Sequence, residues 1–184
     1  MKNDGIIFTS APLDAAPAQR KAYDALDSLG IKYEGVSHEH ADTIEQCLAI
    51  EDVLKVKVCK NLFLCNQQKT KFYLLLMPGD KKFKTKLLSK QINSARLSFA
   101  DNENMMKYLG VTPGSVSVLG LINDTNNEVS LIIDEDLLKD EYIGCHPCLN
   151  TATLKIKADD IINKFLPSTG HSYITVNLKE TEEQ

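Results

Sequence analysis

The tetrapeptide Cys145–Cys148 carries the most recognisable reactive groups in the chain, two cysteines separated by His146 and Pro147. Such spacing is typical of thiol redox centres and of zinc sites. A redox centre requires the first cysteine at the start of a helix, whereas the following Leu149–Leu154 is typical of a strand. Zinc would need further ligands from His38 and His40, a spacing that matches no common zinc motif. We therefore expect buried, unreactive cysteines and no metal or other cofactor.

Three other features could contact a substrate. His146 precedes Pro147, which favours extended backbone, so its ring is either a structural residue or a group that orients a substrate. Lys60 opens the apolar run Asn61–Leu64 and is either a solvated strand end or a point charge for a phosphate. The segment Thr112–Ser117 is typical of a turn, in which Gly114 would let backbone N–H groups approach a ligand.

The basic residues are concentrated in one part of the chain. The chain has a net charge of −4, but Lys55–Arg96 contains eleven basic residues and one acid, a net +10 that leaves −14 elsewhere. Such polarity either reflects a solvated lysine-rich face or attracts a polyanion such as RNA to one side. The basic residues are Lys55, Lys57, Lys60, Lys69, Lys71, Lys81, Lys82, Lys84, Lys86, Lys90 and Arg96.

Length and composition indicate one globular domain with a sizeable core. The chain has 184 residues, 43% hydrophobic and 25% charged. No apolar run approaches the roughly 20 residues that span a bilayer, and the first residues do not resemble a signal peptide. Five cysteines, an odd number, favour a reducing compartment, so we expect a cytoplasmic protein without a membrane partner. We assign residues 1–178 to the domain and 179–184 to an acidic tail.

Helices are predicted from caps and apolar spacing. One starts after Asp14 and stops at Gly30; a second starts at a capping box formed by Asp42 and Glu45. Three more are predicted over Lys84–Gln91, Asn102–Leu109 and Asp159–Phe165.

Strands are predicted from short apolar runs bounded by polar residues. Asn61–Cys65 and Phe72–Met77 are predicted to pair as a hairpin around the polar turn Asn66–Lys71. Because strands and helices do not alternate strictly, we expect an α+β fold, a single compact domain with a mixed, mostly antiparallel sheet and surrounding helices. The other expected strands are Tyr33–Ser37, Leu97–Ala100, Val116–Ile122, Glu128–Ile133, Leu149–Lys155 and Tyr173–Leu178.

Six short stretches, in family order, resemble the YbaK/prolyl-tRNA-synthetase-associated editing domains, and within them the freestanding editing proteins that deacylate alanyl-tRNA(Pro). Together they cover about residues 20–178. They are His38 with Thr43–Glu45, Lys60–Leu64, Arg96–Ala100, Leu109–Ser117, Gly120–Asp124, and His146–Pro147 with Asn150–Thr153. The resemblance implies a compact α+β domain around a mixed sheet.

The resemblance also implies roles for individual residues. Lys60 would engage the 3′-terminal adenosine or its phosphate, Asn61 would help to shape that pocket, and His146 would border the aminoacyl pocket. The implied substrate-binding residues are Gly114, Ser115, Val116, Gly144 and Asn150. For docking of the tRNA itself we expect the basic cluster Lys81, Lys82, Lys84, Lys86 and Lys90.

The chain departs from the family pattern in the loop after Gly114. The family has Gly-x-x-x-Pro followed by phenylalanine, where this chain has Val118 and Leu119, and leucine where it has Cys148. We therefore expect a loop backbone that is less constrained.

The resemblance predicts a deacylase that hydrolyses mischarged alanyl-tRNA(Pro). The reaction needs a positioned water or ribose hydroxyl and donors for the oxyanion, but no catalytic triad or metal. The expected partners are the acceptor end of tRNA(Pro) and prolyl-tRNA synthetase, and no DNA. Three alternatives stay open: deacylation of another tRNA such as cysteinyl-tRNA(Pro), a non-catalytic module that binds aminoacyl-tRNA, and a thiol oxidoreductase.

Overall fold

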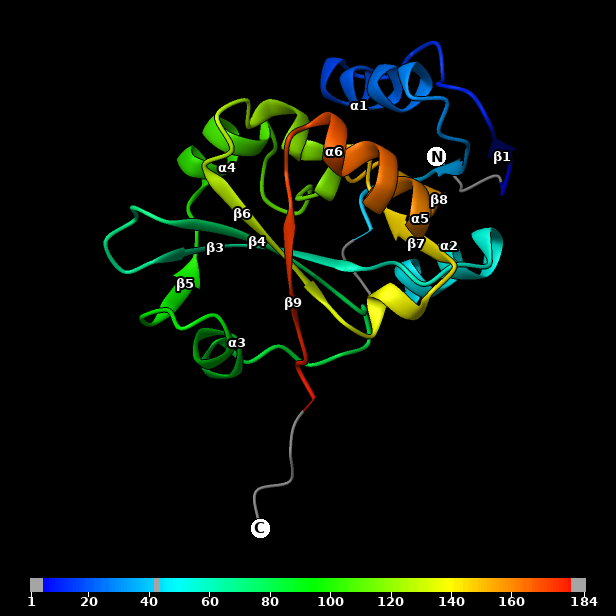
Figure 1. Cartoon of the computed structure of the whole chain (residues 1–184). Helices are drawn as coiled ribbons and strands as arrows, with labels where there is room; N and C mark the ends of the chain where they lie inside the picture. The colour runs from blue at the N-terminus through cyan, green and yellow to red at the C-terminus, as the bar shows by residue number, and fades with distance from the viewer. Residues whose placement is uncertain (1–4, 42–43, 180–184) are drawn as a thin grey trace.

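The computed structural model of the chain describes residues 5–41 and 44–179 (Figure 1). Three expectations lie wholly or partly outside these ranges, one of them the stretch Thr43–Glu45, of which Thr43 is outside. Asp42, the expected cap of the second helix, is outside them, and of the expected acidic tail only Lys179 is inside.

A four-stranded antiparallel sheet, here called sheet A, has the order β1-β2-β8-β7. β2 pairs along its whole length with β8, with Tyr33 opposite Ile156 and Ser37 opposite Ala152. β7 then pairs with the other side of β8, with Cys145 opposite Leu154. The strands are β1 (Ile7–Phe8), β2 (Tyr33–Ser37), β7 (Tyr142–Cys145) and β8 (Ala152–Lys157).

A five-stranded mixed sheet, here called sheet B, has the order β5-β3-β4-β6-β9. The hairpin of β3 and β4 is antiparallel, with Lys60 opposite Met77 and Asn61 opposite Leu76. β6 and β9 add in parallel on one side, and the short β5 forms the opposite edge. The strands are β3 (Lys60–Asn66), β4 (Phe72–Met77), β5 (Leu97–Phe99), β6 (Val129–Asp134) and β9 (Tyr173–Val176).

Helices cover the sheets and connect their strands (Figure 1). Glycines in the left-handed conformation follow two of them, Gly30 (φ 64°) after α1 and Gly110 (φ 64°) after α4, because glycine adopts positive φ without steric cost. The helices are α1 (Pro17–Ser28), α2 (Ile44–Leu54), α3 (Thr85–Gln91), α4 (Asn102–Leu109), the 3₁₀ helices η1 (Val118–Asn123) and η2 (Leu137–Lys139), and a continuous segment of α5 (Ala158–Asp160), a π-helical turn (Ile161–Phe165) and α6 (Leu166–Ser168).

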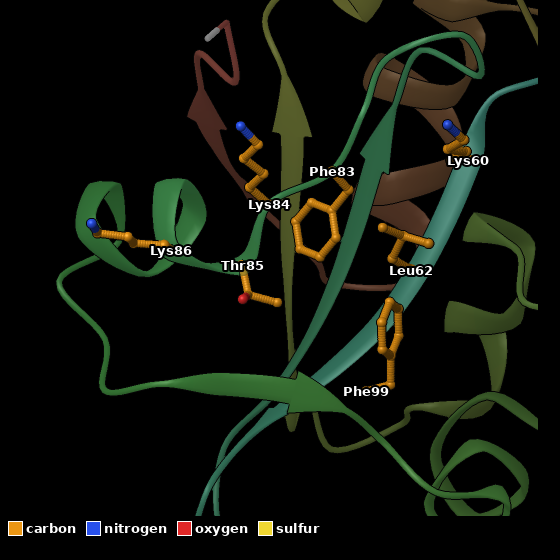
Figure 2. A pocket seen from close by; sticks show the side chains of 7 residues that line it. All are labelled: Lys60, Leu62, Phe83, Lys84, Thr85, Lys86 and Phe99. Atoms are coloured by element: carbon orange, nitrogen blue, oxygen red, sulfur yellow. The ribbon is translucent and has the colours of Figure 1, made fainter. Parts of the chain in front are cut away.

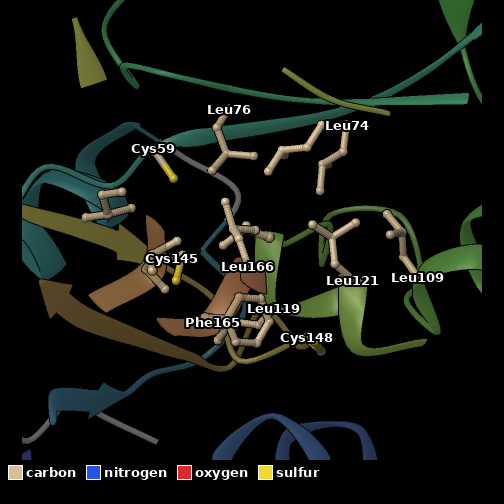
Figure 3. Packing of buried hydrophobic residues seen from close by; sticks show 14 of the residues in the cluster. Cys59, Leu74, Leu76, Leu109, Leu119, Leu121, Cys145, Cys148, Phe165 and Leu166 are labelled. Carbon is tan, nitrogen blue, oxygen red and sulfur yellow. The ribbon is translucent and has the colours of Figure 1, made fainter. Parts of the chain in front are cut away.

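Sheet B has apolar side chains on both faces. Successive residues of a strand point to opposite faces, so alternate residues pack into two different clusters. Phe63, Leu74 and Leu76 point to the inner face and join the main core. Figure 3 shows Leu74 and Leu76 there, with Cys59, Cys145 and Leu119 in the same core. Leu64 and Leu75 point to the outer face, where α3 covers them. Residues of one strand can therefore take part in two separate environments.

The α+β fold class with mostly antiparallel strands is confirmed, but the strands form two sheets where one was expected. The prediction of a strand over Val116–Ile122 is wrong, because this segment ends in η1. The strand expected over Leu149–Lys155 begins later, at Ala152, and its partner β7 was not foreseen. No helix in the described residues is long and apolar enough to cross a membrane.

Candidate functional site

Lys60 and Asn61, adjacent at the start of β3, face opposite sides of sheet B. The Lys60 ammonium donates a hydrogen bond to the carbonyl oxygen of Lys81, 2.7 Å away on the outer side. The Asn61 carboxamide oxygen accepts a hydrogen bond of 3.0 Å from the N–H of Val118 on the inner side. Consecutive Cα atoms are only about 3.8 Å apart. The start of β3, here called the strand entrance, is therefore where the outer and inner faces of sheet B come closest along the chain.

The carbonyl oxygen that accepts the hydrogen bond from Lys60 belongs to Lys81, whose side chain is held by two carboxylates. Its own ammonium lies 2.6 Å from Asp134, whose side chain is fully buried, and 3.0 Å from Asp136. Burial lowers the pKa of Lys81, but its hydrogen bonds to Asp134 and Asp136 outweigh burial and leave that pKa raised. Because two carboxylates already engage this ammonium, the geometry does not favour the expected contact of Lys81 with tRNA.

The loop after Gly114 is tied to two other parts of the chain. Gly114 has a φ of 81°, and the Ser115 N–H closes the turn on the carbonyl of Thr112. The Ser115 hydroxyl accepts a hydrogen bond from the N–H of Asn150, and the Ser117 hydroxyl donates one of 2.6 Å to the carbonyl of His146. Sequence analysis named Ser115 but missed Ser117, which is fully buried.

Val118 adds a third tie that the family's proline could not make. Proline has no N–H, whereas the Val118 N–H donates to Asn61. Val118 therefore restrains the loop by a hydrogen bond, where proline would restrain it through its ring, and the expectation of a less constrained backbone stays a prediction. Because this hydrogen bond uses the carboxamide oxygen of Asn61, the role of Asn61 in this structure is to position the loop 114–118.

His146 presents a defined, uncharged imidazole. Its Nδ1 lies 2.9 Å from the carbonyl oxygen of Ala152, so Nδ1 carries the proton and Nε2 is left as an acceptor. Burial lowers the pKa of His146, while the Ala152 carbonyl partly opposes this effect. The ring meets His38 edge-on at a centroid distance of 6.1 Å. The His38 pKa is likewise lowered by burial, and its Nε2 bonds to Thr153.

Asn150 and Gly144 have packing partners within the protein. The Asn150 carboxamide bonds both backbone groups of Ala41, at 3.3 and 3.5 Å. A Cβ at Gly144 would lie 2.8 Å from the carbonyl oxygen of Lys57, so glycine is needed for close backbone contact. Both backbone groups of Gly144 are also paired, with Lys57 and Cys59. This geometry favours a packing role for Gly144 over the expected contact with a substrate.

Two of the remaining predicted lysines, Lys84 and Lys86, line an open groove on the outer face of sheet B (Figure 2). The groove has a volume of about 590 Å³. Lys82 and Lys90 are exposed on the same segment but do not line it. Phe83 and Phe99 belong to the groove, and sequence analysis gave neither a role. The lining residues are Lys60, Leu62, Phe83, Lys84, Thr85, Lys86 and Phe99.

Other lysines of the basic segment form surface ion pairs. Lys55 pairs with Asp52, Lys57 with Asp80, and Lys69 with Asp101. Such exposed pairs contribute little to stability, but they reduce the local positive charge. None of these three lysines lines the groove, whose lining includes Lys60, Lys84 and Lys86.

The cysteines of Cys145–Cys148 are buried and free, as expected. Burial raises the pKa of the Cys145 thiol well above its ordinary value and that of Cys148 to about 12. Both thiols are therefore protonated and unreactive near neutral pH. Within the described residues, no three His, Cys, Asp or Glu side chains gather as metal ligands.

Comparisons with known proteins find one family and several relatives along most of the chain. The aminoacyl-tRNA editing domain family matches residues 38–164. The prolyl-tRNA editing protein ProX of Acetoanaerobium sticklandii is 32% identical over 161 residues, covering 88% of this chain and 98% of that protein. Prolyl-tRNA synthetase associated domain-containing protein 1 of Bos taurus is 32% identical over 174 residues, covering 92% and 98%. A solved structure of a candidate trans-editing enzyme for prolyl-tRNA synthetase shares the fold, with a TM-score of 0.69 at 19% identity, covering 91% of this chain and all of that one.

Proposed function

The chain belongs to the aminoacyl-tRNA editing domain family, and from this premise we propose that it is a deacylase that hydrolyses mischarged alanyl-tRNA(Pro). One observation supports this most strongly: the matched residues 38–164 include His38, Lys60, Asn61, the loop 114–118, His146 and Asn150, and hydrogen bonds join the loop to Asn61, His146 and Asn150. The substrate would be the acceptor end of tRNA(Pro), and prolyl-tRNA synthetase, which produces the mischarged tRNA, would be the functional partner.

The loop 114–118 and His146 would form the wall of the aminoacyl pocket. A prolyl-tRNA synthetase cannot strongly reject the smaller alanine, because missing methylene groups forfeit only about 1–3 kcal/mol. A pocket that admits alanine and excludes proline by size corrects this error. Such exclusion requires a rigid wall that does not move to make room for the larger side chain. The ties of Ser115, Ser117 and Val118 give the wall that rigidity.

His146 would orient the amino acid through its unprotonated Nε2. A neutral imidazole can accept a hydrogen bond from the substrate's α-ammonium group, whereas an imidazolium would repel it. A water molecule, oriented by the free ribose hydroxyl, would then attack the ester carbonyl carbon. The bond from that carbon to the ribose oxygen breaks, the water oxygen stays on the released amino acid as part of its carboxylate, and a proton of the water passes to the ribose oxygen.

Lys60 would fix the terminal nucleotide on the other side of the strand entrance. Its ammonium has three N–H groups, of which one is used on the Lys81 carbonyl, so two remain for a phosphate or the adenosine. The ester linkage joins nucleotide and amino acid, and would lie near the start of β3, between Lys60 and the loop that Asn61 holds.

The test is a deacylation assay with alanyl-, cysteinyl-, seryl- and prolyl-tRNA(Pro). We expect rapid loss of the ester from alanyl-tRNA(Pro) and none from prolyl-tRNA(Pro). Preferential hydrolysis of cysteinyl-tRNA(Pro) would retain the enzyme class and refute the assigned amino acid. No hydrolysis of any of the four would refute the proposed deacylase activity.

A further inference from the structure

The groove on the outer face of sheet B has an unusual lining for a protein surface. Phe99 lies on the edge strand β5 and is 60% exposed, while Phe83 and Leu62 are partly buried beside it. The two phenyl rings meet edge-on at a centroid distance of 6.3 Å, so they do not stack on each other. The exposed ring of Phe99 therefore has a face available for another planar group.

Positive groups surround this aromatic surface. Figure 2 shows Lys84 and Lys86 on one side of the phenyl rings and Lys60 on the other. Among the residues that the structure describes, the lining has no acidic residue. In a chain of net charge −4, this is a local reversal of sign, and it selects for an anionic partner.

We propose that the groove binds a nucleobase of the single-stranded 3′ end of tRNA, stacked on Phe99, with the neighbouring phosphates on Lys84 and Lys86. An aromatic platform within a cationic groove is the usual means of binding single-stranded nucleic acid without reading its sequence. The volume of about 590 Å³ is in the range of small-ligand sites. This proposal rests on the proposed function, since it assigns a place to the unpaired nucleotides that precede the aminoacylated adenosine.

Lys60 connects the groove with the strand entrance. It lines the groove, and its neighbour Asn61 contacts the loop 114–118 on the inner face. A strand of RNA that leaves the groove past Lys60 would carry its terminal ester toward that loop. The groove would contribute affinity and direction, whereas the inner face would select the amino acid.

The chain contains no tryptophan, which permits a direct test. Phe99→Trp introduces a single tryptophan that a stacked base should quench. Tyr173→Trp is the matched control, because Tyr173 is an exposed aromatic residue on β9, at the opposite edge of the same sheet. Each variant is titrated with deacylated tRNA(Pro), with the same tRNA lacking its last three nucleotides, and with tripolyphosphate, while anisotropy of labelled tRNA reports binding independently.

We expect full-length tRNA to quench Phe99→Trp, the truncated tRNA and tripolyphosphate to leave it unquenched, and Tyr173→Trp to respond to none of them. Phe99→Ala should weaken tRNA binding about tenfold and Phe99→Leu nearly as much, since leucine retains apolar area without an aromatic face. Unchanged Phe99→Trp emission at tRNA concentrations that saturate the anisotropy signal, or no tRNA binding at all, would overturn the proposal. Equal quenching of Phe99→Trp by full-length tRNA and by truncated tRNA would also overturn it.

Two further readouts distinguish the stacking site from a contact between copies of the chain and from the proposed deacylase function. A change in oligomeric state of Phe99→Ala, measured by sedimentation, with unchanged tRNA affinity would assign Phe99 to contact between copies of the chain through the β5 edge, and would refute the stacking site. If tRNA quenches Phe99→Trp but the wild-type protein hydrolyses no aminoacyl-tRNA, the groove is supported and the deacylase function fails.

Discussion

Lys60 and Asn61 are neighbours in the chain, yet the two faces of sheet B that they enter differ in how their polar groups are satisfied. On the inner face, Asn61, Ser115, Ser117 and the Nδ1 of His146 all bond to other protein groups. On the outer face, an exposed phenyl ring and several lysine side chains border an open groove. A preformed wall can discriminate among amino acids by size, whereas a charged open surface supplies affinity without much selectivity.

The largest effect is expected from Lys60→Ala, which removes the ammonium group at the start of β3, where the two faces meet. We predict a loss of about 100-fold or more in kcat/KM for alanyl-tRNA(Pro), equivalent to about 2.7 kcal/mol, with an unchanged melting temperature. Lys32→Ala, which removes an exposed lysine outside the basic segment, is the control. Wild-type activity in Lys60→Ala would show that Lys60 is only a solvated strand end. It would also contradict the proposal that the two faces have different functions.

The outer face is tested next by changing Lys82, Lys84, Lys86 and Lys90 together to serine. Each phosphate contact contributes about −0.7 to −0.9 to the slope of log affinity against log salt concentration. We expect the variant to have a slope shallower by about two or three, and tRNA affinity about tenfold lower at moderate salt. Lys81 is omitted because Asp134 and Asp136 engage it. Equal slopes in both proteins would show that these lysines only solvate the surface.

The inner face is tested by a double-mutant cycle on the bond between Asn61 and Val118. Asn61→Ala leaves the Val118 N–H without its partner and should lower the free energy of unfolding by about 1–3 kcal/mol. Val118→Pro removes the N–H itself, and proline is tolerated there because Val118 opens η1 and Ser117 before it is extended (φ −148°, ψ 149°).

In the Val118→Pro background, Asn61→Ala should therefore cost much less than it does alone. The measurement is denaturant unfolding of the four proteins, with the relative rates on alanyl- and prolyl-tRNA(Pro) as a second readout. Additive costs would mean that this hydrogen bond does not hold the loop.

The smallest effect is expected from pH, through His146. Because burial lowers its pKa below 6.5, His146 stays neutral at neutral pH, and kcat/KM should fall only when acidification protonates it. The unfolded chain binds this proton more readily than the folded one, so stability also declines as the pH falls below about 6.5. His38 and His40 are the titratable neighbours that act on its pKa. An acid limb of the kcat/KM profile that is identical in His146→Gln would show that another group causes it.

Local patterns predicted the parts of the fold that depend on neighbouring residues. The hairpin of β3 and β4 follows from two uninterrupted apolar runs, and α4 follows from the Asp101 cap and Gly110. The segment at Val118 was misread because its alternation resembles a strand. Its first N–H groups are bound by the side chains of Asn61 and Ser117, and the Asn61 contact spans 57 residues of sequence.

The site was predictable to a similar extent. The resemblance identified the residues of the strand entrance and the loop, and strict alternation along β3 would already have placed Lys60 and Asn61 on opposite faces. The pairing of Lys81 with Asp134 could not be inferred, because it joins residues 53 positions apart whose charges alone do not select each other. Phe99 gave no signal, since a phenylalanine in a predicted strand is ordinarily buried.

The hydrogen bonds that hold the loop 114–118 come from two hydroxyl groups, a carboxamide and main-chain groups. The Val118 side chain is buried in the main core, whereas that of Val116 is only partly buried against it. A change of side chain at position 116 can therefore alter the size or shape of the proposed wall while the hydrogen bonds that set the path of the backbone are retained. We therefore expect single substitutions at position 116 to change the amino-acid preference of the proposed pocket without loss of the fold. This makes position 116 the natural place to begin a mutational library for altered editing.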